Sequence, residues 1–216
     1  SYDFLDGEDT SLTLSAGRFF SQLGLETRDL TGLYQFSNGY TVAGPGSALG
    51  LQDGVRLNYS SDMFAVGLSV VDGAFTNDKL ASELGYELFA SFTGVENLTV
   101  SAGYASEETE AGVDLDIWTV NASYQIGDLL LGAEFADGEL GAATDAQSYL
   151  VMANYSVNDW LGFTARYSNA EVGAVEFTEY TLAALFTVHD NLGIIVEYRH
   201  DDEDTSGDEA DTIAVE

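Results

Sequence analysis

Residues 98–136 read LTVSAGYASEETEAGVDLDIWTVNASYQIGDLLLGAEFA, and this stretch contains the pattern that decides the fold. Apolar residues such as Trp118 and Val120 alternate with small or polar residues. This period of two is typical of β-strands with one apolar face. A short turn-forming segment follows at 125–128, whereas a longer acidic segment precedes at 106–114. The stretch therefore predicts antiparallel strands that are joined alternately by short turns and long loops.

The same pattern extends along almost the whole chain, and one cycle of two strands takes about 31–35 residues, which is typical of an up-and-down antiparallel β-barrel. We expect an all-β transmembrane barrel of at least twelve strands, with short periplasmic turns and long acidic outer loops. It would form a single domain over residues 1–216, with strand-like residues at both ends that indicate incomplete termini. The predicted strands are 11–19, 54–60, 63–71, 83–93, 98–105, 115–124, 129–136, 147–155, 160–169, 178–188 and 192–200, with a last strand from 212.

Aromatic residues favour a membrane barrel over a soluble β-sandwich, which would show the same alternation. On the apolar phase they collect at the strand ends, with leucine, valine and alanine between them. A sandwich core more often places its large rings in the middle of strands, whereas a bilayer selects two aromatic rims around an aliphatic band. Examples are Tyr124, Tyr155 and Trp160 beside short turns, and Tyr104, Trp118 and Tyr180 beside long loops.

The composition excludes several classes of protein. There are 37 acidic and 6 basic residues, a net charge of −31. Binding to nucleic acid needs lysine and arginine to neutralise phosphates, so we expect no nucleic-acid partner. Cysteine is absent, which excludes disulfides and cysteine-based metal or redox sites. The sequence contains neither an apolar run of transmembrane-helix length nor a signal peptide.

Charged residues on the polar phase of the strands predict a water-filled interior, because charges that face lipid are costly whereas charges that face water are not. Two interpretations of the arginines remain open. They either face the acids of a constriction and set a transverse field across a pore, or form structural ion pairs with Glu87, Glu134 and Glu197 that plug a narrow lumen. The phase of Arg18 is ambiguous because Gly17 can mark a bulge. The predicted pore-lining residues are Arg56, Glu87, Glu134, Arg166, Glu197 and Arg199.

The longest connection without strand periodicity lies within residues 17–54 and holds the only proline, Pro45. Structureless connections of this length are uncommon in compact domains and usually functional. The connection is rich in leucine and aromatic residues, which a solvated loop would not need. We therefore expect the loop at 20–53 to fold into the lumen as a constriction, formed by Glu26, Arg28, Asp29 and Tyr34.

The acidic loops and the two histidines are the other candidate sites. Clustered carboxylates can bind Ca²⁺, which takes oxygen ligands, although a solvated, self-repelling loop is the simpler interpretation. Apart from that cation we expect no cofactor. His200 beside acidic residues is weak evidence for catalysis, and His189 lies in a short turn. No nucleophile, zinc or phosphate-loop motif is present, so we expect no enzyme. The candidate Ca²⁺ ligands are Asp201, Asp202, Asp204 and Asp208.

The chain resembles the beta-barrel porins of the OmpL-like type from Gram-negative outer membranes. The resemblance is spread over most of the chain and rests on short, degenerate motifs. They lie at 17–19 (GRF), 23–26 (LGLE), 31–37 (TGLYQFS) with Tyr40, 53–55 (DGV), 84–87 (LGYE) and 93–100 (TGVENLTV).

This resemblance implies passive diffusion of small hydrophilic solutes or ions, and it implies no reaction. The implied partners are membrane lipid, lipopolysaccharide and further copies in a homo-oligomer. The high negative charge adds an expected modest preference for cations. Two alternatives from other classes are a structural or adhesive outer-membrane barrel with a filled lumen, and an exported acidic β-sandwich that binds a partner.

Overall fold

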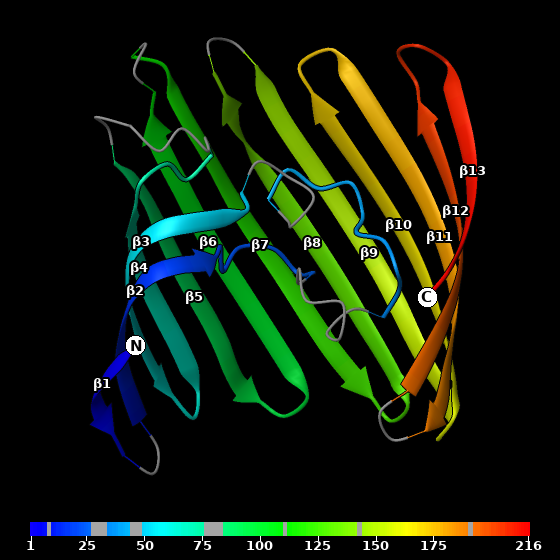
Figure 1. Cartoon of the computed structure of the whole chain (residues 1–216), viewed down its shortest axis with the longest axis horizontal. Coiled ribbons are helices and arrows are strands. Elements are labelled where there is room, and N and C mark those ends of the chain that lie inside the picture. Colours follow the sequence, from blue (N-terminus) through cyan, green and yellow to red (C-terminus); the bar gives the residue numbers. More distant parts are fainter. Residues whose placement is uncertain are drawn as a thin grey trace.

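The protein folds into a single sheet of thirteen strands in sequence order (Figure 1). The computed structural model describes residues 1–7, 10–26, 34–43, 49–75, 84–109, 112–141, 144–189 and 192–216. The strands are β1 (Tyr2–Asp6), β2 (Thr10–Phe20), β3 (Leu51–Ser61), β4 (Phe64–Val71), β5 (Gly85–Val95), β6 (Leu98–Glu108), β7 (Asp114–Ile126), β8 (Leu129–Leu140), β9 (Asp145–Asn158), β10 (Leu161–Val172), β11 (Val175–His189), β12 (Leu192–Glu203) and β13 (Asp208–Val215).

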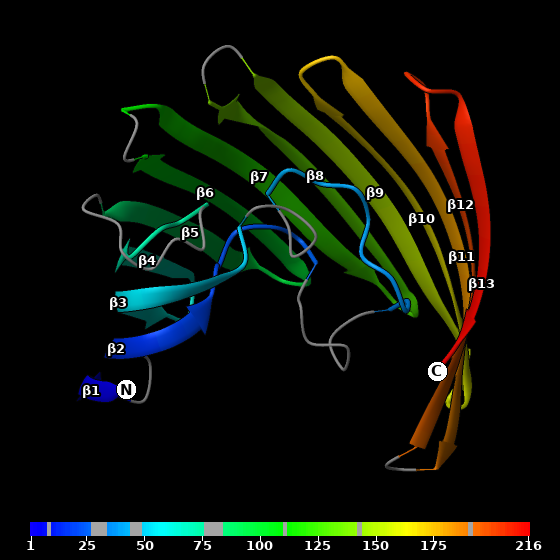
Figure 2. The ribbon, with the colours of Figure 1, turned by 45° about the horizontal axis from the view of Figure 1, so that its top comes forward.

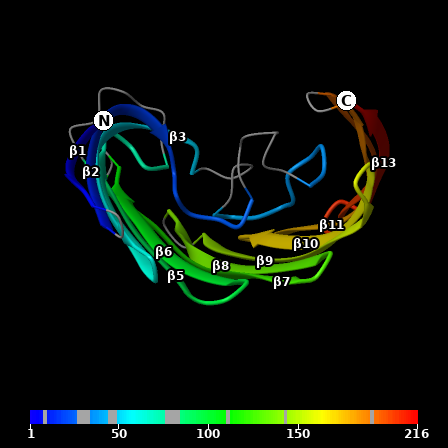
Figure 3. The same ribbon diagram turned by 90° about the horizontal axis from the view of Figure 1, so that it is seen from below.

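Every strand pairs antiparallel with the next, which confirms the predicted all-β, up-and-down topology. The sheet curves strongly around a concave space, and β1 and β13 are the two ends of this arc (Figures 2 and 3). The described residues between β2 and β3 lie within this concave space. In the part of the chain that the structure describes, no helix is long and apolar enough to cross a membrane.

The strands continue past several predicted ends into the acidic segments. β12 extends to Glu203 and β13 begins at Asp208, so much of the predicted loop at 201–211 is a regular hairpin. β10 and β11 likewise meet at a tight turn where Gly173 has a φ of +61°, a conformation that glycine adopts without strain. Hydrophobic alternation stops where side chains leave the apolar layer, but backbone pairing does not depend on it. The alternation of apolar and polar residues therefore ends several residues before the strands end.

The convex face of the sheet is apolar and uncovered. Leu182 is 58% exposed, and Val120 is 43% exposed in the middle of β7. Aromatic rings pair across neighbouring strands on this face, as in Trp118 with Phe135 and Trp160 with Phe186. An uncovered apolar surface of this extent is unsuited to water. A soluble sandwich is excluded because no second sheet covers this face in the described residues.

The buried core lies on the concave face, between the wall and the inner segment, which we define as residues 21–26, 34–43 and 49–50. Small wall residues such as Ala105 and Ala136 are fully buried against apolar residues of this segment and of the β4–β5 connection. Wall glycines allow a still closer approach. A Cβ atom added at Gly103 would lie 2.6 Å from a side-chain carbon of Leu23. The wall is therefore shaped to receive the inner segment.

Candidate functional site

Carboxylates on the concave face bind the backbone of the inner segment. Glu87 accepts a hydrogen bond from the backbone N–H of Gln22 at 3.0 Å. Glu197 accepts two, from Phe36 at 2.7 Å and from Ser37 at 3.1 Å. A segment outside a helix or sheet has unsatisfied N–H groups, and an ionised carboxylate is a strong acceptor for them. The wall carboxylates thus accept hydrogen bonds that a neighbouring strand would accept in a sheet.

Further contacts hold the segment along the wall. Glu134 on β8 accepts hydrogen bonds from the backbone N–H of Leu25 and from the hydroxyl of Thr41. Ser168 on β10 accepts the N–H of Tyr40 at 2.9 Å, and Ser148 on β9 accepts that of Val42 at 3.0 Å. The described parts of the segment therefore contact the wall at many points rather than hanging free in the lumen.

Arg166 is the centre of a buried ion-pair network. Its guanidinium lies 2.7 Å from Glu26 of the inner segment and 2.5 Å from Glu179 of β11. The side chains of Arg166 and Glu179 are completely buried, and that of Glu26 is 3% exposed. Arg166 also donates to the carbonyl of Ser37 at 2.6 Å. A buried charge needs such partners, because desolvation otherwise destabilises it strongly.

The other two inner arginines are also paired. Arg56 lies 3.0 Å from Glu87, and its guanidinium stacks 4.0 Å above the ring centre of Phe19. Arg199 lies 2.7 Å from Asp201 and 3.5 Å from Glu179. The guanidinium of Arg199 is also 5.0 Å from the ring of Tyr40, and burial raises the pKa of that phenol above its usual value.

The structure places all six predicted pore-lining residues on the concave face. Arg56, Arg166 and Arg199 each have a carboxylate partner. Of the three predicted partners, only Glu87 forms an ion pair among the described residues, so the choice between the two interpretations stays open. Arg18 points outward instead and pairs with Asp53 at 2.6 Å. Sequence reasoning missed Glu179, which lay close to the predicted start of its strand; its shared phase with the polar Thr181 could have identified it.

The predicted constriction residues differ in where the structure places them. Glu26 is buried in the network, whereas Tyr34 is 40% exposed and its carbonyl accepts a hydrogen bond from Thr164 of β10. Arg28 and Asp29 lie outside the residues that the structure describes. The role of these residues in a constriction therefore stays a prediction.

The predicted Ca²⁺ ligands do not converge. Asp201 and Asp202 are neighbours in β12, so their side chains leave opposite faces of the sheet. Asp204 lies in the turn and Asp208 in β13, while Asp201 is engaged by Arg199. Among the described residues no group of three or more acidic, histidine or cysteine side chains could hold a metal ion.

His200 contacts an acidic neighbour on the outward phase of the sheet. The Nδ1 atom of His200 lies 2.9 Å from Asp211, and the hydroxyl of Tyr198 donates to the same carboxylate at 2.7 Å. These three residues share the outward phase of β12 and β13. His189 lies exposed at the end of β11.

Three cavities lie along the inner segment. One of about 370 Å³ adjoins residues 38–42 and the ends of β8, β10, β11 and β12. A polar one of about 530 Å³ lies near the β9–β10 turn and is lined in part by Tyr34. A smaller one of about 190 Å³ is lined by Leu25, Glu26 and Met152, among others. The segment therefore leaves spaces near both ends of the strands.

A curved antiparallel wall with an apolar exterior, a charged interior and an inner segment defines a transmembrane β-barrel of the outer-membrane type. The sequence profile described as Gram-negative porin matches residues 13–206. The chain belongs to this family, and it is an outer-membrane porin. Among curated proteins, no sequence matches the chain at a significant level.

Solved structures share the fold. The chain is similar to a porin refined at high resolution, with 18% identity, a TM-score of 0.66 and coverage of 95% of this chain and 76% of that one. The chain is 17% identical to OmpT, an outer-membrane protein of Vibrio cholerae, with a TM-score of 0.70 and coverage of 98% of this chain and 83% of that one. An anion-selective porin from Comamonas acidovorans is 15% identical, with a TM-score of 0.64 and coverage of 92% of this chain and 65% of that one. At these identities the likeness concerns the fold alone.

Proposed function

We propose that the protein is a narrow, modestly cation-selective channel for passive diffusion of small hydrophilic solutes and ions, without catalysis. The observation that carries this proposal is the inner segment, which wall carboxylates hold within the concave space. A net charge of −31 concentrates cations near the mouth. An anion-selective porin has the same fold, so ion preference must come from the residues of this chain rather than from the architecture.

Shortening the inner segment tests this function. Replacing residues 28–44 by a short glycine–serine linker removes Phe36–Tyr40 and their contacts with the wall, and we expect the single-channel conductance to rise severalfold in planar bilayers. Reversal potentials in a salt gradient should show cation preference in the unmodified protein. A conductance that does not change would mean that the segment does not limit flow.

A structural barrel with a filled lumen is the second candidate. It is favoured by the pairing of Arg56, Arg166 and Arg199, and by the apolar cluster between the wall and the inner segment. This alternative predicts no conductance before or after shortening. The same recordings therefore distinguish the two candidates.

We further propose that the apolar convex face contacts membrane lipid and lipopolysaccharide, and that copies of the chain associate. OmpT of Vibrio cholerae, which shares the fold, has been solved in a trimer form. Chemical cross-linking in native membranes would show the number of copies.

Cysteine labelling tests the orientation. Ser206 lies in the β12–β13 turn. Ser61 is the last residue of β3 and lies at the opposite end of the strands. In outer-membrane barrels the short turns face the periplasm. We expect Ser206→Cys to react with a membrane-impermeant maleimide on intact cells and Ser61→Cys to react only after disruption. The reverse pattern would invert the proposed orientation.

A further inference from the structure

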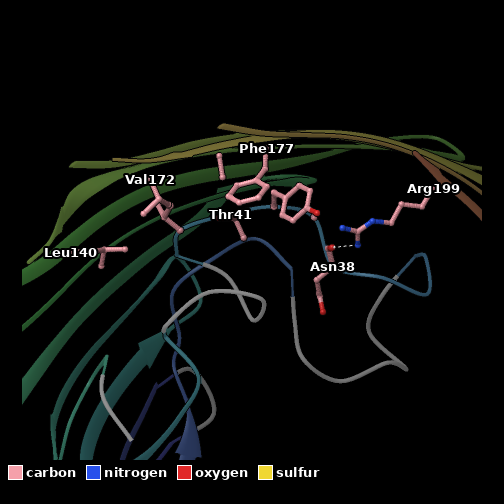
Figure 4. Close-up of a pocket in the computed structure, with 10 residues that line it drawn as sticks. Asn38, Thr41, Leu140, Val172, Phe177 and Arg199 are labelled. Carbon is pink, nitrogen blue, oxygen red and sulfur yellow. Dashed lines mark hydrogen bonds between the residues drawn. The ribbon is translucent and has the colours of Figure 1, made fainter. Parts of the chain in front are cut away.

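The cavity of about 370 Å³ beside residues 38–42 has an apolar floor and an aromatic side (Figure 4). Val42, Leu140, Ala170 and Val172 supply the apolar surface. Figure 4 shows the ring of Phe177 pointing from the wall into this space, while Arg199 reaches toward the carbonyl of Asn38. Sites for small molecules are typically concave and mostly apolar, with a few polar groups that orient the ligand.

Two aromatic rings from distant parts of the chain meet here. Tyr40 of the inner segment and Phe177 of β11 have ring centres 5.2 Å apart and are tilted by 34°. Both side chains are half-buried, so part of each ring remains open to the cavity. The faces of aromatic rings attract cations through their quadrupole.

The charge around the cavity disfavours an anion. Arg199 is the only basic residue in the described lining, and it already contacts Asp201, Glu179 and the carbonyl of Asn38. The register places Glu203 of β12 directly across from Phe177, on the same face of the sheet. Carboxylates therefore outnumber the arginine here, and an anionic solute would compete with them for its donors.

We propose that this cavity is a binding subsite for small organic cations that carry an apolar body, such as a primary alkylammonium group joined to a single aromatic ring. The apolar body would lie on Val42 and Val172, next to Phe177. The ammonium group would face the aromatic rings and the carboxylates of Asp201 and Glu203. This inference rests on the proposed channel function and names a class of solute that binds transiently while it passes through the channel.

Block of the channel by three probes of matched size tests the proposal. Phenethylammonium, neutral 2-phenylethanol and anionic phenylacetate are added in turn on the β12–β13 side of planar bilayers. We expect phenethylammonium alone to produce resolved blocking events. Phe177→Leu keeps the site apolar but removes the ring, and should weaken the block by about threefold to tenfold. Glu203→Gln should weaken it as well.

Phe163→Leu is the matched control, because Phe163 lies on the outward face and is 48% exposed. It should leave the block unchanged. Equal block by all three probes would overturn the choice of a cation, and equal effects of Phe177→Leu and Phe163→Leu would overturn the location. An open channel without block by any probe would overturn the subsite while leaving the channel function intact.

A channel without conductance would contradict the proposed function, and calorimetric titration of phenethylammonium into detergent-solubilised protein would still test the subsite. Binding that Phe177→Leu weakens would support the site. A lack of heat with the unmodified protein would overturn it.

Discussion

Replacing Arg166 with methionine is expected to destabilise the folded barrel by about 3–5 kcal/mol, because it removes the nearest cation from two buried carboxylates. Glu179 and Glu26 lie within 2.7 Å of this guanidinium and are almost completely shielded from water. The contact with the carbonyl of Ser37 is lost as well. Urea-induced unfolding in detergent micelles or lipid vesicles, followed by tryptophan fluorescence, would measure the change.

Arg18→Met is the matched control for this substitution. The same chemical change breaks the pair with Asp53, but those side chains are 48% and 39% exposed. Both residues lie near the ends of their strands, where water and salt screen such a pair, so its loss should be barely measurable. Adding Glu179→Gln to Arg166→Met should recover part of the stability, since it removes a buried charge that has lost its nearest cation. Similar unfolding curves for Arg166→Met and Arg18→Met would contradict the buried network.

Arginine at Val120 is expected to impair folding into bilayers by about 2–4 kcal/mol, the range found for charged side chains near the midplane of outer-membrane barrels. Val120 lies on the convex face in the middle of β7. Leu131 and Ala184 share the outward phase, and the same change there should have a similar effect. The measurement is folding into vesicles at increasing urea, read by the faster migration of unboiled folded protein on a gel.

The control must be on the concave face but away from packed contacts. Ser123→Arg suits this purpose, because Ser123 lines the cavity of about 190 Å³. Alternation alone suggests Thr119 and Thr164 as equally mild positions, but these side chains are only 1% and 2% exposed. Arginine would displace the inner segment at Thr164, whose hydroxyl binds Tyr34. Equal damage at Val120 and Ser123 would argue against a lipid-facing surface.

Much of the barrel was predictable from the sequence because strand periodicity and contact with lipid both depend on adjacent residues. Alternation of Trp118 and Val120 with Thr119 sets the face of each side chain, and it holds wherever lipid lies on one side. The same rule placed the charges of Arg56, Arg166 and Glu197 inside. It also identified the connection before β3 as exceptional, since its leucine and aromatic content does not suit a solvated loop.

The partners of those charges were not predictable, because they come from residues far apart in the chain. Glu26 and Arg166 are 140 positions apart, and Phe36 and Glu197 are 161 positions apart. Glu107 illustrates the same limit. It is one of several acids in a predicted loop, yet in the structure it is buried on β6 and accepts the N–H of Phe75 at 2.7 Å.

The sequence by itself thus determined the class of fold, the topology of neighbouring strands and the face on which each side chain lies, because strand periodicity and contact with lipid act on adjacent residues. Only the tertiary structure decided that Glu87, Glu134 and Glu197 hold the backbone of the inner segment. That arrangement depends on the curvature of the whole sheet, which brings β5, β8 and β12 around one irregular segment.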